Sequence, residues 1–178
     1  MMTRALTWIR RFRDAREGVS AVEFALIAPI MILFYFGMAE ICQGFMAQKR
    51  TEHVAYAIAD LVAQDDEVST AELNDVFSVA VQVFRPFPTA TLRQRITSVT
   101  RTSNVNRVDW SSHSNWSARV VNSSVTLPTD LIANGESIVM SEVEYVYASP
   151  FDNVMPASTT FRKTQYMRPR LTDKVELL

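Results

Sequence analysis

An uncharged apolar run near the N-terminus constrains this chain more than any other feature. Residues 24–39 (FALIAPIMILFYFGMA) contain no charged side chain, and residues 19–22 extend the run on the other side of Glu23. At about 1.5 Å per helical residue the whole stretch forms a helix of roughly 30 Å, which is the thickness of the hydrocarbon core of a bilayer. The sequence therefore predicts a membrane-spanning helix.

Charged residues beside this run predict its orientation. Residues 1–18 contain five arginines against Asp14 and Glu17, a net charge of +3, which leaves −4 of the formal total of −1 for the other residues. Cations beside a first membrane segment stay in the cytoplasm. We therefore expect a basic cytoplasmic leader over 1–18, a transmembrane helix over 19–42 and a periplasmic body. A basic head joined to an acidic body also argues against nucleic-acid binding.

The first helix is expected to continue beyond the membrane as residues 43–64. This stretch has no proline, and it keeps an apolar stripe with the 3.6-residue period of a helix, formed by Val54, Ile58, Leu61 and Val62. One helix over about 19–64 follows, docked on the body through that stripe. Pro29 frees the carbonyl of Ala25, which predicts a bend inside the membrane segment.

A second helix is predicted by its start and stop signals. Ser69 with Glu72 forms a capping box, and Val68 with Leu73 is placed as a hydrophobic staple. The helix therefore begins at Ser69 or Thr70, and the prolines at 86 and 88 end it. Its expected apolar face consists of Leu73, Val76, Phe77, Ala80 and Phe84.

Strand composition follows these prolines. Residues 137–148 alternate, with Glu142 and Glu144 on one face, as in an antiparallel strand with one side in water. Residues 116–120 alternate in the same way, and 93–101 and 159–166 are weaker candidates. We therefore expect residues 65–178 to form a periplasmic α+β domain with a small antiparallel sheet.

The segment from Arg16 to Ala25 (REGVSAVEFA) carries the most specific signal. It resembles the processing site of Tad-type pilus proteins, in particular the TadE/TadG-like family, and more loosely that of all type IV prepilins. The resemblance covers residues 10–50, and it implies that a membrane-embedded aspartyl prepilin peptidase cuts between Gly18 and Val19. It also implies that Glu23, the fifth residue of the mature chain, acts in assembly.

Elementary chemistry gives each of these positions a reason. Glycine has no Cβ, so an extended backbone at Gly18 can enter a protease cleft closely. A carboxylate in an apolar membrane segment is costly unless it is paired. As apolar helices pack, the new α-amine of Val19 on a neighbouring subunit could neutralise Glu23. The alternative is that Glu23 is an interfacial charge at the membrane edge.

These signals together predict a minor pilin or pseudopilin of a Tad-type pilus, held in the bacterial inner membrane and found outside the cell once incorporated in a pilus. Its partners would be the prepilin peptidase, other pilins and the proteins of the assembly platform. The four glycines form no phosphate-binding loop and flank no nucleophilic serine, so we expect no enzyme and no cofactor.

Two rival interpretations use the same apolar run. Gly37-Met38-Ala39 has the small-x-small pattern of a conventional signal peptidase site, and cleavage after Ala39 would release a soluble body. The other rival is an uncleaved single-pass anchor with a periplasmic binding domain. The N-terminal residue of the mature protein distinguishes the three interpretations.

A few other residues are candidates for contacts. Cys42 is the single cysteine, which predicts a packing role or an intermolecular disulfide. Charges are also segregated along the chain: residues 60–75 are acidic, and a basic C-terminal region includes Arg168 and Arg170. This pattern predicts either two solvated faces or a salt-dependent contact within or between subunits.

The histidines and tryptophans give weaker signals. His53 and His113 lack partners at metal-ligand spacing, so we expect no metal site and assign them structural or solvent-facing roles. Trp110 and Trp116 flank a serine-rich stretch, where they could anchor a loop in the core or present an aromatic surface to a glycan.

Overall fold

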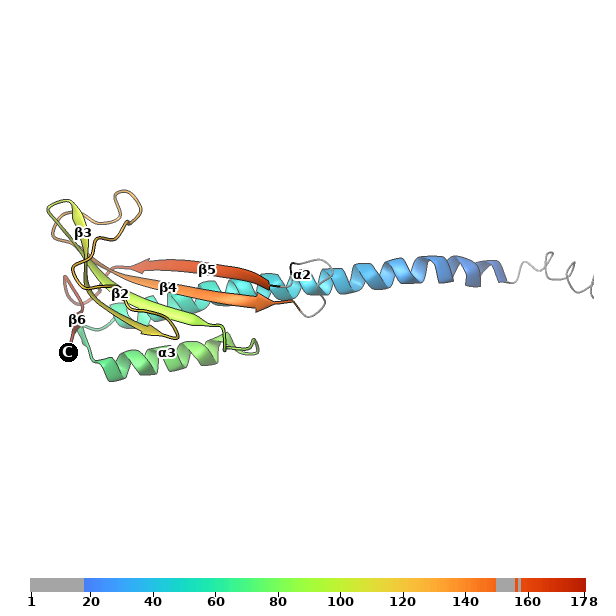
Figure 1. Cartoon of the computed structure of the whole chain (residues 1–178), viewed down its shortest axis with the longest axis horizontal. Helices are drawn as coiled ribbons and strands as arrows, with labels where there is room; N and C mark the ends of the chain where they lie inside the picture. Colours follow the sequence, from blue (N-terminus) through green and yellow to red (C-terminus); the bar gives the residue numbers. More distant parts are fainter. Residues whose placement is uncertain (1–17, 150–155, 157) are drawn as a thin grey trace, which may run out of the picture.

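A long helix that projects from a small α+β domain defines the molecule (Figure 1). The computed structural model describes residues 18–149, 156 and 158–178. Helix α2 covers Val19–Ala63, and its second half packs against the domain while its first half extends away from it. Residues 1–17 of the predicted leader lie outside the described residues. The predicted α+β class is confirmed.

Helix α2 matches the predicted range of 19–64 to within one residue. It continues through Pro29 without interruption. Of the predicted docking stripe, Val54, Ile58 and Val62 are fully buried, whereas Leu61 is 39% exposed. The sheet and the second helix cover the face that these three residues share, so tertiary packing orders the second half of the helix.

Helix α3 covers Thr70–Phe84 and begins as its capping signals predict. The Ser69 backbone N–H donates to Glu72 Oε2 at 2.7 Å, and the Glu72 N–H donates to Ser69 Oγ at 3.3 Å. The Ser69 hydroxyl also donates to Glu72 Oε2, at 2.8 Å. The bond from the Ser69 backbone N–H lowers the pKa of the Glu72 carboxyl most, and the bond from the Ser69 hydroxyl lowers it further. The helix buries one face, formed by Leu73, Phe77, Ala80 and Phe84.

The sheet has four antiparallel strands in the order β3-β2-β4-β5. They are β2 (Arg93–Thr102), β3 (Val105–Ser114), β4 (Ser137–Ala148) and β5 (Ser158–Met167). A separate parallel pair joins β1 (Glu67–Val68) to β6 (Glu176–Leu177), so the C-terminal tail lies against the turn between the two helices. The strands predicted at 137–148, 93–101 and 159–166 are thus confirmed.

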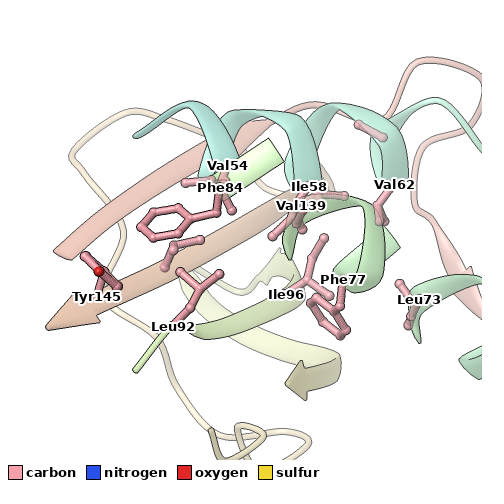
Figure 2. Packing of buried hydrophobic residues seen from close by; sticks show 14 of the residues in the cluster. Val54, Ile58, Val62, Leu73, Phe77, Phe84, Leu92, Ile96, Val139 and Tyr145 are labelled. Carbon is pink, nitrogen blue, oxygen red and sulfur yellow. The ribbon is translucent and has the colours of Figure 1, made fainter. Parts of the chain in front are cut away.

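The main core lies between the sheet and the two helices. Figure 2 shows Val54, Ile58 and Val62 of α2 above Val139 and Ile96 of the sheet, with the α3 residues beside them. Phe84 meets Tyr145 with ring centroids 4.5 Å apart. A smaller apolar cluster lies on the opposite face of the sheet, under the segment that joins β3 to β4; it contains Val99, Val108, Val125, Leu127, Ile132, Ile138 and Met140.

One strand prediction is wrong, and one strand was missed. Residues 116–120 follow the end of β3 and form no strand; Arg119 in this segment donates from Nη2 to Glu142 Oε1 at 2.8 Å. The strand β3 was not predicted, because its alternation slips: Ser98 pairs with Trp110 and Val99 pairs with Val108, so Asp109 is an extra residue in a bulge.

The expectation that one face of β4 is exposed to water is also wrong. Glu142 is only 9% exposed and Glu144 only 5%. Strand β4 is central, so arginines from both neighbouring strands and from the preceding segment cover the two carboxylates.

Candidate membrane anchor and processing site

Gly18 lies immediately before α2 as its N-cap residue, and its backbone does not need a glycine. Its φ of −94° is accessible to any residue. A Cβ added there would meet no atom within 4 Å. Neither backbone strain nor packing against the described residues therefore requires a glycine at this position.

Val19 and Glu23 lie one helical turn apart on α2, on the same side of the helix. Val19 is 50% exposed, and Glu23 is exposed as well. In the part of the chain that the structure describes, Glu23 has no ion-pair partner. The geometry leaves both groups accessible to a neighbouring subunit.

The first half of α2 exposes a continuous apolar surface. Its most apolar 18-residue window contains no buried residue, and the helix is long and apolar enough to cross a membrane. Phe24 and Leu33, for example, are each 72% exposed. An apolar surface of this length on an otherwise well-packed chain suggests a membrane anchor or a surface that packs on other helices.

The docked half of the helix begins at Glu40, which is fully buried although it carries a carboxylate. Ser149, just after the end of β4, donates a hydrogen bond to Glu40 Oε1. Gly44 and Ala47 follow on the same face and are also buried, so the sheet approaches the helix closely there. Sequence analysis gave Glu40 no role, although a carboxylate directly after an apolar run is a detectable signal.

The other predicted positions do not converge on one site. Cys42 is exposed on α2. His53 is exposed on the same helix, and His113 lies on β3. Within the described residues, no group of three or more histidines, cysteines and acids is placed to hold a metal ion.

The arginines of the predicted basic C-terminal region form ion pairs with different acids of the chain. Arg170 pairs with Asp60, and its backbone N–H donates to Ala63 O at 2.9 Å. Arg168 instead pairs with Glu136, with Nη2 3.1 Å from Oε2. One arginine therefore joins the acidic segment, and the other does not.

The two tryptophans take different roles. Trp110 is 5% exposed, and its Nε1–H donates to Val175 O at 2.8 Å, which holds the C-terminal tail against the sheet. Trp116 is half-buried, and the Arg95 guanidinium lies 4.3 Å from its ring centroid. Both residues are thus occupied in contacts within the chain.

Comparison with known families supports this view of the N-terminal segment. Residues 18–60 match the family model described as TadE-like protein. This segment is TadE-like. No curated protein and no solved structure matches the chain.

The TadE-like segment covers a defined part of the structure. It begins at Gly18 and includes the exposed apolar half of α2 and nearly all of the docked half, but none of the sheet. The match confirms the resemblance over this segment and supports involvement in the assembly of a Tad pilus. The family match and the exposed apolar surface coincide in the N-terminal helix.

Proposed function

We propose that the protein is a minor pilin or pseudopilin of a Tad-type pilus, processed by a prepilin peptidase between Gly18 and Val19. The observation that carries the proposal is the exposed apolar half of α2, which begins directly after a glycine that the fold itself does not require. The leader would remain on the cytoplasmic side, and the α+β domain would face the periplasm.

Assembly is the proposed role of Glu23. Cleavage would create a free α-amine at Val19, and Glu23 is exposed one turn further along the helix. When apolar helices of neighbouring subunits pack, an amine and a carboxylate in an apolar surrounding stabilise each other strongly, because each is costly without the other. The pair would therefore fix the register between neighbouring subunits.

The two rival interpretations account for less of the structure. The Ala39–Glu40 peptide bond lies inside α2, and Glu40 is buried against Ser149, so conventional cleavage there would cut the helix at the point where it joins the domain. An uncleaved anchor leaves Glu23 in an apolar segment without a partner. Both rivals leave Gly18 without a role.

Substitution of Glu23 tests the assembly step separately from cleavage. Glu23→Ala keeps Gly18 and the apolar segment, so the chain should still be cut. It should fail to join other pilins in co-purification and piliation assays. Glu23→Gln should behave like Glu23→Ala, because an amide cannot neutralise an ammonium group. Normal piliation by processed Glu23→Ala protein would refute a role for the carboxylate.

A further inference from the structure

Two glutamates of β4 lie beneath four arginines on the sheet face opposite the helices. Glu142 accepts from Arg95 Nε at 2.8 Å and from Arg119 Nη2 at 2.8 Å. Burial disfavours the charge on Glu142, but the bonds from Arg119 and Arg95 outweigh this and hold its pKa below the usual range. The first carboxylate is thus fully occupied by its two arginines.

The second carboxylate has two arginines with unused donors. Glu144 Oε1 accepts from Arg93 Nη1 at 3.1 Å, and Glu144 Oε2 accepts from Arg162 Nε at 2.9 Å. The side chains of Arg93 and Arg162 are nevertheless 49% and 65% exposed. Because a guanidinium has five N–H donors, both residues can bind a further acid without releasing Glu144.

We call this surface the arginine face; it consists of Arg93, Arg95, Arg119 and Arg162. Four cations over two carboxylates leave a surplus charge of +2. The helices cover the other side of the sheet, and the smaller apolar cluster covers only the part of this side that includes Val99 and Ile138. Arg93 and Arg162 lie outside the part that this cluster covers, near the end of β4 that points toward the exposed half of α2 (Figure 1).

A surplus of the opposite sign lies at the other end of the domain. The acidic corner is the turn from α2 into α3, and its exposed acids are Asp65, Asp66, Glu67, Glu72 and Asp75. None of them has an ion-pair partner within the described residues, whereas nearby Asp60 is paired with Arg170. Asp65, Glu67 and Asp75 in particular are free to meet a cationic surface.

We infer that the arginine face of one copy binds the acidic corner of a second copy. The two surfaces are complementary in charge. Each copy carries one of each, and they lie on different parts of the molecule. Such a contact is heterologous, so it does not close in a pair of copies but continues from one copy to the next. The inference rests on the proposed function only in that a pilus brings several copies together.

The position of the two surfaces sets the offset between the copies. Lys163 Nζ lies 3.9 Å from Glu52 Oε2, which places Arg162 near the level of Glu52 on α2. Asp65 follows Glu52 by 13 residues, a rise of about 20 Å along a helix. Two copies anchored at the same depth in a bilayer are level, so the contact requires that one copy be raised along the helix axis by about this distance.

Disulfide cross-linking of the full-length chain tests the contact. In a Cys42→Ser background, one tagged form carries Thr160→Cys on β5 and a second carries Thr70→Cys at the start of α3; both positions are exposed. The two forms are mixed in detergent and oxidised. We expect a mixed dimer at 0.1 M salt whose yield falls at 1 M, since the Debye length shortens from about 10 to about 3 Å.

Matched charge changes decide whether the acidic corner is responsible. Asp65→Asn with Glu67→Gln in the Thr70→Cys form should lower the yield about fivefold or more, because two exposed ion pairs are lost. Gln82→Lys with Thr126→Lys alters the net charge equally at two other exposed positions and should leave the yield unchanged. Wild-type yield from the neutralised corner would overturn the inference.

A charge exchange provides the complementary test. Arg162→Glu should lower the yield while Arg93 remains paired with Glu144, and mixing it with a form carrying Asp65→Lys and Glu67→Lys should restore the yield. Failure of this restoration, with both proteins folded, would contradict a direct contact. No step needs the peptidase or a pilus, so the result is independent of whether cleavage occurs at Gly18.

Discussion

Ser149 and Glu40, 109 residues apart in the chain, are joined by a hydrogen bond at the point where the long helix leaves the domain. The bond connects the end of β4 to a fully buried carboxylate. It ties α2 to the sheet at the point where the exposed half of the helix begins.

Replacement of Glu40 should therefore weaken the junction. Glu40→Ala leaves the Ser149 hydroxyl without its acceptor and opens a cavity, which should cost on the order of 2–4 kcal/mol. Glu40→Gln retains an acceptor and should cost less. Thermal unfolding in detergent measures the effect, with Ile41→Ala, at a half-exposed neighbouring position, as control. Equal melting temperatures for Glu40→Ala and Ile41→Ala would contradict this account.

The pair of arginines on Glu142 predicts a loss of stability in acid. Since the folded-state pKa of Glu142 lies below its ordinary 4.5, ionisation stabilises the fold above that pH, and the contribution disappears as the pH falls through the folded-state pKa. Glu142→Gln should lower the free energy of unfolding at neutral pH by on the order of 2–4 kcal/mol.

The pH series supplies the decisive comparison for Glu142. The difference between Glu142→Gln and the wild type should narrow as the pH falls below 4.5. Glu52→Gln, which removes a carboxylate that is 38% exposed, serves as control and should change stability by less than about 1 kcal/mol. A constant difference for Glu142→Gln across the series would mean that its charge does not stabilise the fold.

Trp110 is predicted to hold the C-terminal tail. Trp110→Phe keeps a buried ring but removes the N–H that donates to Val175 O, so an acceptor is left unpaired at a cost of about 1–3 kcal/mol. Proteolysis should remove the tail more readily in this variant, and mass spectrometry of the products measures it. Trp116→Phe serves as control and should leave the rate of proteolysis of the tail unchanged. If the tail is cleaved at the same rate in the two variants, Trp110 does not have the assigned role.

The two C-terminal arginines should differ in their effect on the acidic segment. Arg170→Glu places a like charge beside Asp60, whereas Arg168→Glu replaces the ion pair with Glu136 by a pair of like charges. Both pairs are exposed, so each change should lower stability by about 1 kcal/mol or less at low salt and by less at high salt. A double change Arg170→Glu with Asp60→Arg should recover the loss, and a further loss instead would refute direct pairing.

Local signals in the sequence were sufficient for the helices and for much of the sheet. The capping box at Ser69 and the apolar run after Gly18 depend on neighbouring residues, so they predict helix limits directly. Strand β4 was recognisable from its alternation. The β2–β3 hairpin was not, because Ser103 and Asn104 form its two-residue turn with φ values of 52° and 63° and without glycine.

The features that the sequence did not predict depend on contacts between residues far apart in the chain. The charges of Glu142 and Glu144 suggested a face in water, and only the central position of β4 explains their burial under arginines from other strands. Glu40 likewise depends on a residue more than a hundred positions away. The assignment of Gly18, Val19 and Glu23 to processing and assembly rests on one continuous segment of the sequence, and it stays a prediction.

Gly18→Ala separates processing from folding. The structure has room for the added methyl group and a compatible φ, so stability should change by less than about 1 kcal/mol. Uncleaved precursor should nevertheless accumulate, which immunoblotting of membranes detects. Efficient cleavage of a stable Gly18→Ala protein would contradict recognition of this glycine by a peptidase.

The N-terminal residue of the mature protein tests the central claim most directly. N-terminal sequencing or intact mass of the protein from bacterial membranes should give Val19 as the first residue. A mature chain that begins at Glu40 would indicate conventional secretion, and one that retains Met1 would indicate an uncleaved anchor. Either of these two results would contradict the proposed pilin.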